Sequence, residues 1–353
     1  MKEKTLEEKQ LNEPKVTNPF KSKETKQNFK IRLFSTFVLL FLLFAYVVSG
    51  ALYTYRQDLN YIEIAAYASF ICSIFLIVSS TFEMNRATGY KKWWQQMITI
   101  FLVIFAFMYP ISSSMYSFDF YSQEWTNLYR WAQPWIFSII IFIIFIIYLL
   151  LAITDKKIGF VKGGINFLMA LILIIAYKGF TIASLSLITT STGTQTAISF
   201  NTIIWIWMMI VFVDSFAYIG GTIWGKTKLA PKISPKKTWE GTAFGWSLAF
   251  FVGVIYSLMF YFFARDFAPF SHFIYQLTIT SGIGYPILLY ILFSFIFPVI
   301  GILGDLLYSW VKRTLNIKDF SKIIPGHGGV LDRLDSITLA WAFLFIIIVI
   351  LMF

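Results

Sequence analysis

Charged residues are scarce in this chain of 353 residues. Asp, Glu, Lys and Arg together make up 13% of it, against about 25% in a typical soluble domain. Hydrophobic residues make up 58% and aromatic residues 20%. The apolar residues also fall in blocks of about 20, the length that crosses a hydrocarbon core of roughly 30 Å. The composition excludes an ordinary soluble protein. It predicts an all-α, polytopic membrane protein with no room for a soluble domain.

Cysteine is nearly absent, and no internal repeat is evident. The single cysteine, Cys72, lies inside an apolar block, which excludes an intrachain disulfide. The net charge of +11 could indicate nucleic-acid binding, but the lysines lie in short loops between apolar blocks. That distribution is typical of orientation signals and of contact with anionic lipids. We therefore expect membrane lipids as partners and no nucleic acid.

The first 31 residues are polar, with eight lysines and five glutamates. They have few large apolar residues, which predicts a disordered cytoplasmic tail over 1–31. The tail is too long and too acidic for the first part of a signal peptide, so we expect the apolar run after it to be a retained span.

Apolar runs predict nine transmembrane helices along the rest of the chain. The predicted spans are Leu33–Tyr55, Tyr61–Phe82, Met97–Tyr116, Trp135–Ile153, Gly164–Ile188, Ala197–Thr222, Ala243–Ala264, Tyr285–Trp310 and Gly329–Phe353.

Basic residues in the connecting loops predict the orientation. Outside loops carry only Arg56, Arg130 and Arg265 if the N-terminus is cytoplasmic. All other loops that carry basic residues then face the cytoplasm, as the positive-inside rule requires. The C-terminus is expected outside. The basic residues of the inside loops are Arg86, Lys91, Lys92, Lys156, Lys157, Lys162, Lys226, Lys228, Lys232, Lys236, Lys237, Lys312, Arg313, Lys318 and Lys322.

A charged segment interrupts the apolar C-terminal part, between Ser309 and Asp335. Charge at bilayer depth is costly and usually marks function. Just before and within the segment, Asp305, Ser309 and Lys312 are spaced by four and three, so they share one helix face. Asp332 and Asp335 are one turn apart at the start of the last span. We expect the three acids to meet near the cytoplasmic surface, where a hard cation such as Mg²⁺ would relieve their repulsion and bind substrate phosphates.

Basic and glycine residues in the same segment suit a polyphosphate. Glycines in the turn before Asp332 allow positive φ and close approach of N–H groups to an anion. The residues in question are Lys312, Arg313, Lys318, Lys322, His327, Gly328, Gly329 and Arg333.

A second polar cluster lies earlier in the chain. Asp214 falls in the sixth span, and a lysine-rich loop follows it. Ser234-Pro235 predicts a helix start, with Ser234 as N-cap and Lys236 and Lys237 in the first turn, where an anion would be attracted. Glu240 could add a metal or base contact.

Simpler interpretations stay open for these residues. Lys236 and Lys237 alone fit an orientation signal, and Asp214 alone could be an ion-pair partner inside the bundle. Gly241 and Gly245 are better explained as a close helix–helix contact. Lys178, in the fifth span, is left unassigned.

The charged segment resembles the signature of the phosphatidate cytidylyltransferase (CDP-diacylglycerol synthase) family. The match extends over roughly the C-terminal 145 residues, including the Asp214–Gly225 stretch and Ser234–Gly241. Two positions depart from the family pattern: Tyr308 replaces a usual acid, and Ser321 replaces a common glycine. The signature positions are Ser309, Lys312, Arg313, Lys318, Asp319, His327, Gly328, Gly329, Asp332, Arg333 and Asp335.

The resemblance implies that CTP and phosphatidate yield CDP-diacylglycerol and pyrophosphate, with Mg²⁺ required and K⁺ as a suggested second ion. It implies that Asp305 and Asp332 bind a paired metal centre. Asp335, Asp214 and Glu240 are weaker candidates. Lys312, Arg313 and His327 would act at the reacting phosphates. Substrate contacts are expected from Ser234, Lys236, Lys237, Ser309, Lys318, Gly328, Gly329 and Arg333.

The resemblance also assigns regions. We expect 32–196 to form N-terminal transmembrane helices and 197–353 the C-terminal catalytic region. It suggests a homodimer, and richness in Lys, Ile and Phe points to a bacterial cell membrane.

Two alternatives remain at this point. One is a CTP-dependent enzyme that acts on another lipid, such as an ether-linked or polyprenyl acceptor. The other is an ion-coupled transporter, since intramembrane acids also mark ion pathways. Against transport, the charges gather at one membrane face instead of lining a path.

Overall fold

Long apolar helices account for most of the chain. The computed structural model describes residues 41, 43–56, 63–109, 134–155, 158–190, 193–196, 198–322, 324 and 328–352. Within these ranges, seven helices are long and apolar enough to cross a membrane, and two shorter apolar helices accompany them. The prediction of a polytopic, helical membrane protein is confirmed. The predicted tail, 1–31, lies outside the described residues.

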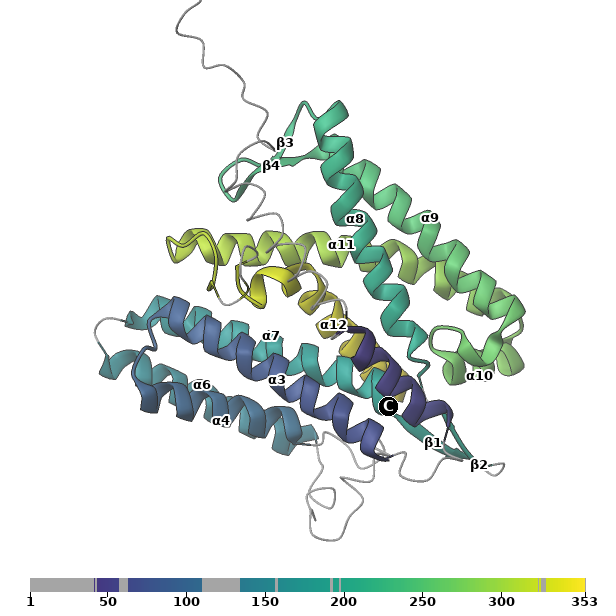
Figure 1. Cartoon of the computed structure of the whole chain (residues 1–353), viewed down its shortest axis with the longest axis horizontal. Helices are drawn as coiled ribbons and strands as arrows, with labels where there is room; N and C mark the ends of the chain where they lie inside the picture. The colour runs from purple at the N-terminus through teal and green to yellow at the C-terminus, as the bar shows by residue number, and fades with distance from the viewer. Residues whose placement is uncertain are drawn as a thin grey trace, which may run out of the picture.

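The N-terminal half is a bundle built around one central helix. That helix, α7 (Gly159–Leu185), is the most deeply buried of the spans and packs against α3, α6 and α12. In Figure 1, α3, α4, α6 and α7 lie roughly alongside one another. The other helices of this half are Leu43–Tyr55, α3 (Glu63–Thr88), α4 (Trp93–Met108) and α6 (Pro134–Thr154).

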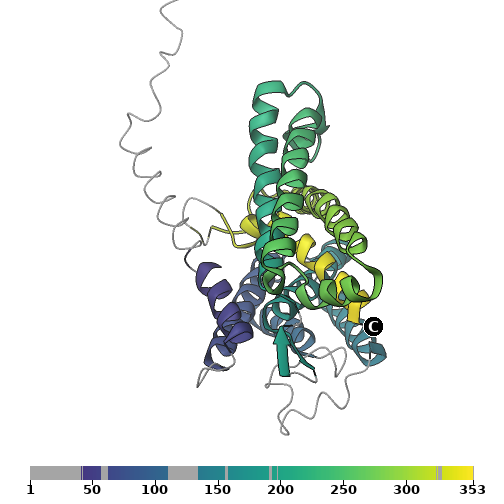
Figure 2. The same ribbon diagram turned by 90° about the vertical axis from the view of Figure 1, so that its right-hand side faces the viewer.

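The C-terminal half adds a long helical hairpin and two further spans. The hairpin pairs α8 (Asn201–Trp224) with α9 (Trp239–Phe263), and Figure 2 shows one end of it extending beyond the remaining helices. The other two spans are α11 (Gly284–Thr314) and α12 (Leu331–Met352), which pack on each other. Because α12 also packs on α7, the two halves share one core.

Short elements connect these helices. Two antiparallel hairpins occur, β1 (Leu187–Thr190) with β2 (Gly193–Thr196), and β3 (Lys228–Ala230) with β4 (Ser234–Thr238). A turn of 3₁₀ helix, η4 (Arg265–Phe267), and a short helix, α10 (Ser271–Ser281), precede α11.

Each of the nine predicted spans contains a helix, with different ends. The first and third are shorter than predicted within the described residues, as Leu43–Tyr55 and Trp93–Met108. The two β-hairpins and α10 were not predicted, because their polar, short segments carry no strong hydropathy signal. The orientation across the membrane stays a prediction.

Trp205 and Trp341 anchor the core of the C-terminal half. The Trp205 indole donates to the Gly253 carbonyl over 2.8 Å, which ties α8 to α9, and its ring meets Tyr290 edge-on. Trp341 stacks on Phe180 with ring centroids 3.9 Å apart. This stack joins α12 to α7. Aromatic packing therefore fixes the position of α12, the helix that carries the last residues of the charged segment.

The predicted close helix–helix contact at Gly241 and Gly245 is confirmed. A Cβ atom at Gly245 would lie 2.5 Å from the amide nitrogen of Ala217 and from the carbonyl oxygen of Val213. At Gly241 it would lie 2.6 Å from the Gly221 nitrogen. The lack of side chains therefore lets α8 and α9 approach backbone to backbone.

Lys178, which the sequence left unassigned, is buried in α7. Its ammonium group donates to the carbonyl oxygens of Phe107, at 2.8 Å, and Tyr109, at 2.5 Å. These carbonyls belong to the C-terminal end of α4, where backbone oxygens lack helical partners and attract a cation. Lys178 thus fastens α4 to the central helix.

Gly245→Ala should destabilise the fold, because the new methyl group would press on the backbone of α8. We expect a loss of about 1–3 kcal/mol in the free energy of unfolding, measured by reversible denaturation in detergent micelles. The matched control is Gly284→Ala, since a Cβ there meets nothing within 4 Å. Equal stability of the two variants would contradict the close approach.

Candidate active site

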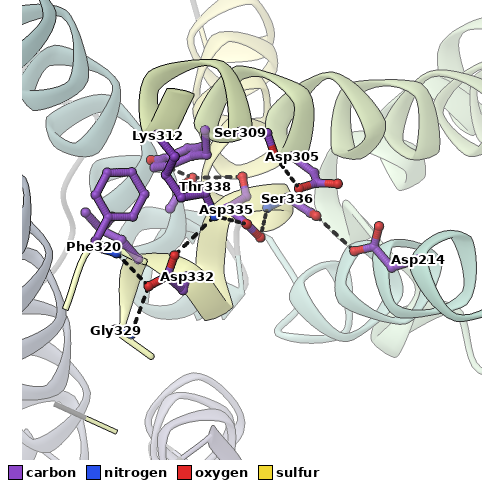
Figure 3. A network of polar contacts seen from close by, with 12 residues as sticks. Asp214, Asp305, Ser309, Lys312, Phe320, Gly329, Asp332, Asp335, Ser336 and Thr338 are labelled. Carbon is purple, nitrogen blue, oxygen red and sulfur yellow. Dashed lines mark hydrogen bonds and ion pairs between the residues drawn. The ribbon is translucent and has the colours of Figure 1, made fainter. Parts of the chain in front are cut away.

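The polar residues of α11 and α12 form one connected network (Figure 3). As the spacing predicted, Asp305, Ser309 and Lys312 lie on the same face of α11, and the Ser309 hydroxyl donates to Asp305 over 3.4 Å. The Lys312 ammonium group reaches across to α12. It lies 3.1 Å from the Oδ1 atom of Asp332 and 3.6 Å from the Oδ2 atom of Asp335. One lysine therefore holds two carboxylates that would otherwise repel each other.

Asp332 closes the loop between the two helices. Its Oδ2 atom accepts hydrogen bonds from the backbone N–H groups of Phe320 and Gly329, both at 2.9 Å. Its side chain is only 4% exposed. Asp332 thus fixes two points of the connecting loop, Phe320 and Gly329, against the start of α12, and its Oδ1 atom faces Lys312.

A second group of acids lies beyond Lys312. The Ser336 hydroxyl donates to the Oδ2 atom of Asp214 over 2.9 Å, which joins α12 to α8. Asp305 lies close enough to both Asp214 and Asp335 to interact with them electrostatically. In Figure 3 these side chains point toward a common region between α8, α11 and α12. Asp305 therefore lies near Asp335 of α12, as predicted, and Asp214 joins them from α8. Asp332 is linked to this group through Lys312.

Lys237 supplies a second positive charge to this group. Its ammonium group forms an ion pair with the Oδ2 atom of Asp305, and both side chains are about one-fifth exposed. Lys237 comes from β4, so the lysine-rich loop after α8 reaches the acids through this residue. The link joins the β3–β4 hairpin to α11.

The predicted helix start at Ser234-Pro235 is wrong. Ser234–Thr238 is strand β4, paired with β3, and α9 begins at Trp239. Thr238 is the N-cap, since its hydroxyl accepts from the Gly241 N–H group over 3.3 Å. The sequence rule fits Ser234 locally, but pairing with Lys228–Ala230 satisfies the backbone as a hairpin. Lys236 and Lys237 therefore lie on a strand and not at a helix N-terminus.

Glu240 shapes the hairpin instead of joining the other acids. Its carboxylate accepts from the backbone N–H groups of Lys226 and Thr227, both at 3.1 Å, and from the Thr227 hydroxyl at 2.5 Å. These contacts bind the two residues just before β3 to the first turn of α9. Its carboxylate is thus engaged by the hairpin it supports.

Several predicted phosphate contacts lie exposed around the network. Gly328 has the expected positive φ, at 89°. The Arg313 side chain donates to the carbonyl oxygen of Ile233 over 3.2 Å, which ties the end of α11 to the hairpin. His327 lies outside the described residues. The exposed basic residues are Lys236, Arg313, Lys318, Lys322 and Arg333.

Carboxylates are suitable ligands for a hard cation, but they do not form a closed cage here. Among the residues that the structure describes, no three His, Cys, Asp or Glu side chains converge tightly enough to hold a metal ion alone. Mg²⁺ commonly binds one or two carboxylates and completes its shell with water and substrate phosphates. The open arrangement of Asp214, Asp305 and Asp335 fits that mode.

Glu83 contacts the charged segment and was missed by sequence reasoning. It belongs to α3, and its carboxylate accepts from the Val330 and Leu331 N–H groups and from the Ser321 hydroxyl. The available signal was an acid directly after an apolar run, at the predicted span end Phe82. An acid at such a boundary usually reads as a loop residue, so the signal was weak.

The structure accounts for the two departures from the family pattern. Ser321 donates to Glu83 over 2.6 Å. Tyr308 is fully buried, its hydroxyl accepts from Thr338 over 2.9 Å, and its ring meets Phe320 edge-on. Tyr308 thus joins α11 to α12 by packing where an acid would need a polar partner.

Comparison with known proteins identifies the family. The model of the cytidylyltransferase family matches residues 20–351, so the chain belongs to this family. A phosphatidate cytidylyltransferase of Rickettsia typhi is 46% identical over 127 residues, which cover 36% of this chain and 49% of the relative. A phosphatidate cytidylyltransferase of Brucella suis is 33% identical over 170 residues, which cover 48% of this chain and 53% of the relative. The chain thus matches about half the length of these curated relatives.

Tyr308→Phe should lower stability without unfolding the protein. The ring keeps its packing, but Thr338 loses an acceptor in a buried position, at a cost of about 0.5–1.5 kcal/mol. Unfolding in detergent measures the change. Tyr218→Phe serves as the control, because Tyr218 is 74% exposed. The assignment fails if both variants are as stable as the unaltered protein.

Proposed function

We propose that this member of the cytidylyltransferase family transfers the cytidylyl group of CTP to phosphatidate, giving CDP-diacylglycerol and pyrophosphate. The observation that supports this most directly is the linked set of carboxylates and ammonium groups between α8, α11, α12 and β4. Asp305, with Lys237 on one side and the Lys312–Asp335 pair on the other, lies at its centre.

The reaction needs positioning more than acid–base chemistry. A phosphate oxygen of phosphatidate attacks the α-phosphorus of CTP, the new P–O bond forms, and the bond to the β-phosphate oxygen breaks. Pyrophosphate leaves with the electron pair of that bond. The attacking phosphate is already ionised, so no strong base is required. The protein must bring two polyanions together and offset the charge at the reacting phosphorus.

Positive side chains can hold these polyanions. Lys237 and Lys312 lie among the acids, and an incoming phosphate would compete with those carboxylates for the ammonium groups. The exposed residues Lys236, Arg313 and Arg333 would contact the outer phosphates of CTP or the lipid phosphate. His327, Lys318, Ser309, Ser234, Gly328 and Gly329 are further candidates from the family resemblance.

Mg²⁺ is the proposed cofactor, with K⁺ as a second candidate ion. Asp305 and Asp335 suit it through their partly exposed oxygens, and Asp214 is an accessible third donor. Asp332 can contribute only through Oδ1, since Oδ2 is taken by two backbone N–H groups. When bound, the ion would supply charge neutralisation at the transferred phosphoryl group. Lys312 would then share its carboxylate partners with the cation.

The proposal places the reaction at the cytoplasmic face of a bacterial cell membrane. There CTP arrives from the cytoplasm, and the lipid enters from the inner leaflet. A homodimer is a further expectation from the family resemblance.

Asp305→Asn should reduce turnover at least about 100-fold, because it removes a charge from the centre of the network. Pyrophosphate release from purified protein measures this, and the unaltered protein should require CTP, phosphatidate and Mg²⁺ together. The control Asp266→Asn changes an exposed acid on η4 and should leave turnover unchanged. Normal turnover in the Asp305 variant would reject the assignment.

The same assay separates the lipid acceptors. Ether-linked phosphatidate and a polyprenyl phosphate are offered in place of phosphatidate at equal surface concentration. Phosphatidate should be used best. Preference for another lipid phosphate would keep the cytidylyl transfer but change the acceptor.

A further inference from the structure

We propose that Glu83 is a positioning residue that holds the start of α12, and with it Asp332 and Asp335, in the geometry that the reaction needs. Glu83 lies on α3, about 250 residues before the segment it contacts. The kinetic part of this inference, the expected effect on turnover, rests on the proposed function. The structural part, the expected effect on the start of α12, rests on the contacts alone.

The Glu83 carboxylate is fully buried, and its hydrogen-bond partners in the described part of the chain are all donors. Oε1 accepts from the Val330 N–H group at 2.9 Å and from the Ser321 hydroxyl at 2.6 Å. Oε2 accepts from the Leu331 N–H group at 2.9 Å. The first N–H groups of a helix lack partners within it. A carboxylate there satisfies them and interacts favourably with the helix dipole.

Gly329 is matched to this carboxylate. A Cβ atom at position 329 would lie 2.5 Å from Oε2 and 2.7 Å from Oε1 of Glu83. The absence of a side chain lets the acid approach the backbone. Gly329 also donates its N–H group to Asp332. The same short turn is therefore held by Glu83 from α3 and by Asp332 from α12.

This arrangement sets the direction of the reactive acids. Asp332 follows Leu331 directly, and Asp335 lies one turn further on. Lys312 contacts both. A rotation or fraying of the first turn of α12 would move these carboxylates relative to Asp305 on α11. Displacements of about 1 Å can reduce rates by roughly 100-fold.

Ser321 adds a side-chain donor at a position where the family pattern commonly has a glycine. Its hydroxyl gives Glu83 a third donor from the loop that Asp332 also holds, at Phe320. The two neighbouring residues thus connect the loop to two different acids. We assign Ser321 to the same positioning unit, with a smaller contribution than the two backbone donors.

Glu83→Gln tests the proposal, because it keeps the size of the side chain but turns one acceptor into a donor. In either orientation the amide NH₂ group would face a backbone N–H group, that of Val330 or that of Leu331. We expect kcat to fall about 10- to 100-fold, as for other residues that orient reactive groups. Hydrogen–deuterium exchange of peptides that contain Val330 and Leu331 should rise at least tenfold, while other helices keep their protection.

Two further variants complete the experiment. Ser321→Gly keeps both backbone donors, so exchange in the same peptides should rise less than in the Glu83 variant, and kcat should fall two- to fivefold. Ser80→Ala is the matched control, since it removes another contact of α3, the 2.9 Å hydrogen bond to Tyr177. It should leave kcat and exchange at Val330 and Leu331 unchanged.

The outcomes separate this inference from the proposed function. Increased exchange confined to the start of α12 supports the structural part, even if the unaltered protein shows no cytidylyl transfer. A loss of kcat with that same local change supports the kinetic part. Unaltered exchange in Glu83→Gln overturns the proposal. If that variant does not fold, unaltered exchange in Ser321→Gly overturns it instead.

Discussion

The backbone N–H groups that precede and begin α12 need acceptors where the chain is otherwise apolar. Two acids provide them. Glu83 accepts from Val330 and Leu331, and Asp332 accepts from Gly329 and Phe320. An unpaired buried N–H group costs about 1–3 kcal/mol, so both acids are strongly held. Because Asp335 and Ser336 follow within the same turns, the rest of the polar network takes its orientation from this point.

Charge balance is the second constraint on the network. Several carboxylates between packed helices would repel one another without cations. Lys312 reduces the repulsion between Asp332 and Asp335 on α12. Lys237, which lies on the β3–β4 hairpin, balances the charge of Asp305. These lysines come from separate elements and remain partly exposed. A phosphate or metal ion arriving at the site would exchange partners with them, which costs less than bringing an uncompensated charge into a low-dielectric region.

The sequence predicted the membrane-spanning helices well because long apolar runs indicate them. Spacing also placed Asp305 and Lys312 on one helix face correctly. It failed at Ser234, where a local capping rule competed with strand pairing to Lys228–Ala230. It missed Glu83 because the contact joins residues about 250 positions apart, and no periodicity in one segment records such a partner. In both cases the structure depends on contacts with residues outside the local segment, which the local sequence pattern does not contain.

The N-terminal helices are therefore part of the site's construction, although the recognisable motifs all lie between Asp214 and Asp335. The family match over residues 20–351 spans both halves. Glu83 reaches the charged segment from α3, and Trp341 stacks on Phe180 of α7. The division at residue 196 thus describes where the motifs lie in the sequence. It does not describe how the site is built, because helices on both sides of residue 196 hold the site in place. A motif can identify the chemistry, while the helices that orient it carry little sequence signal of their own.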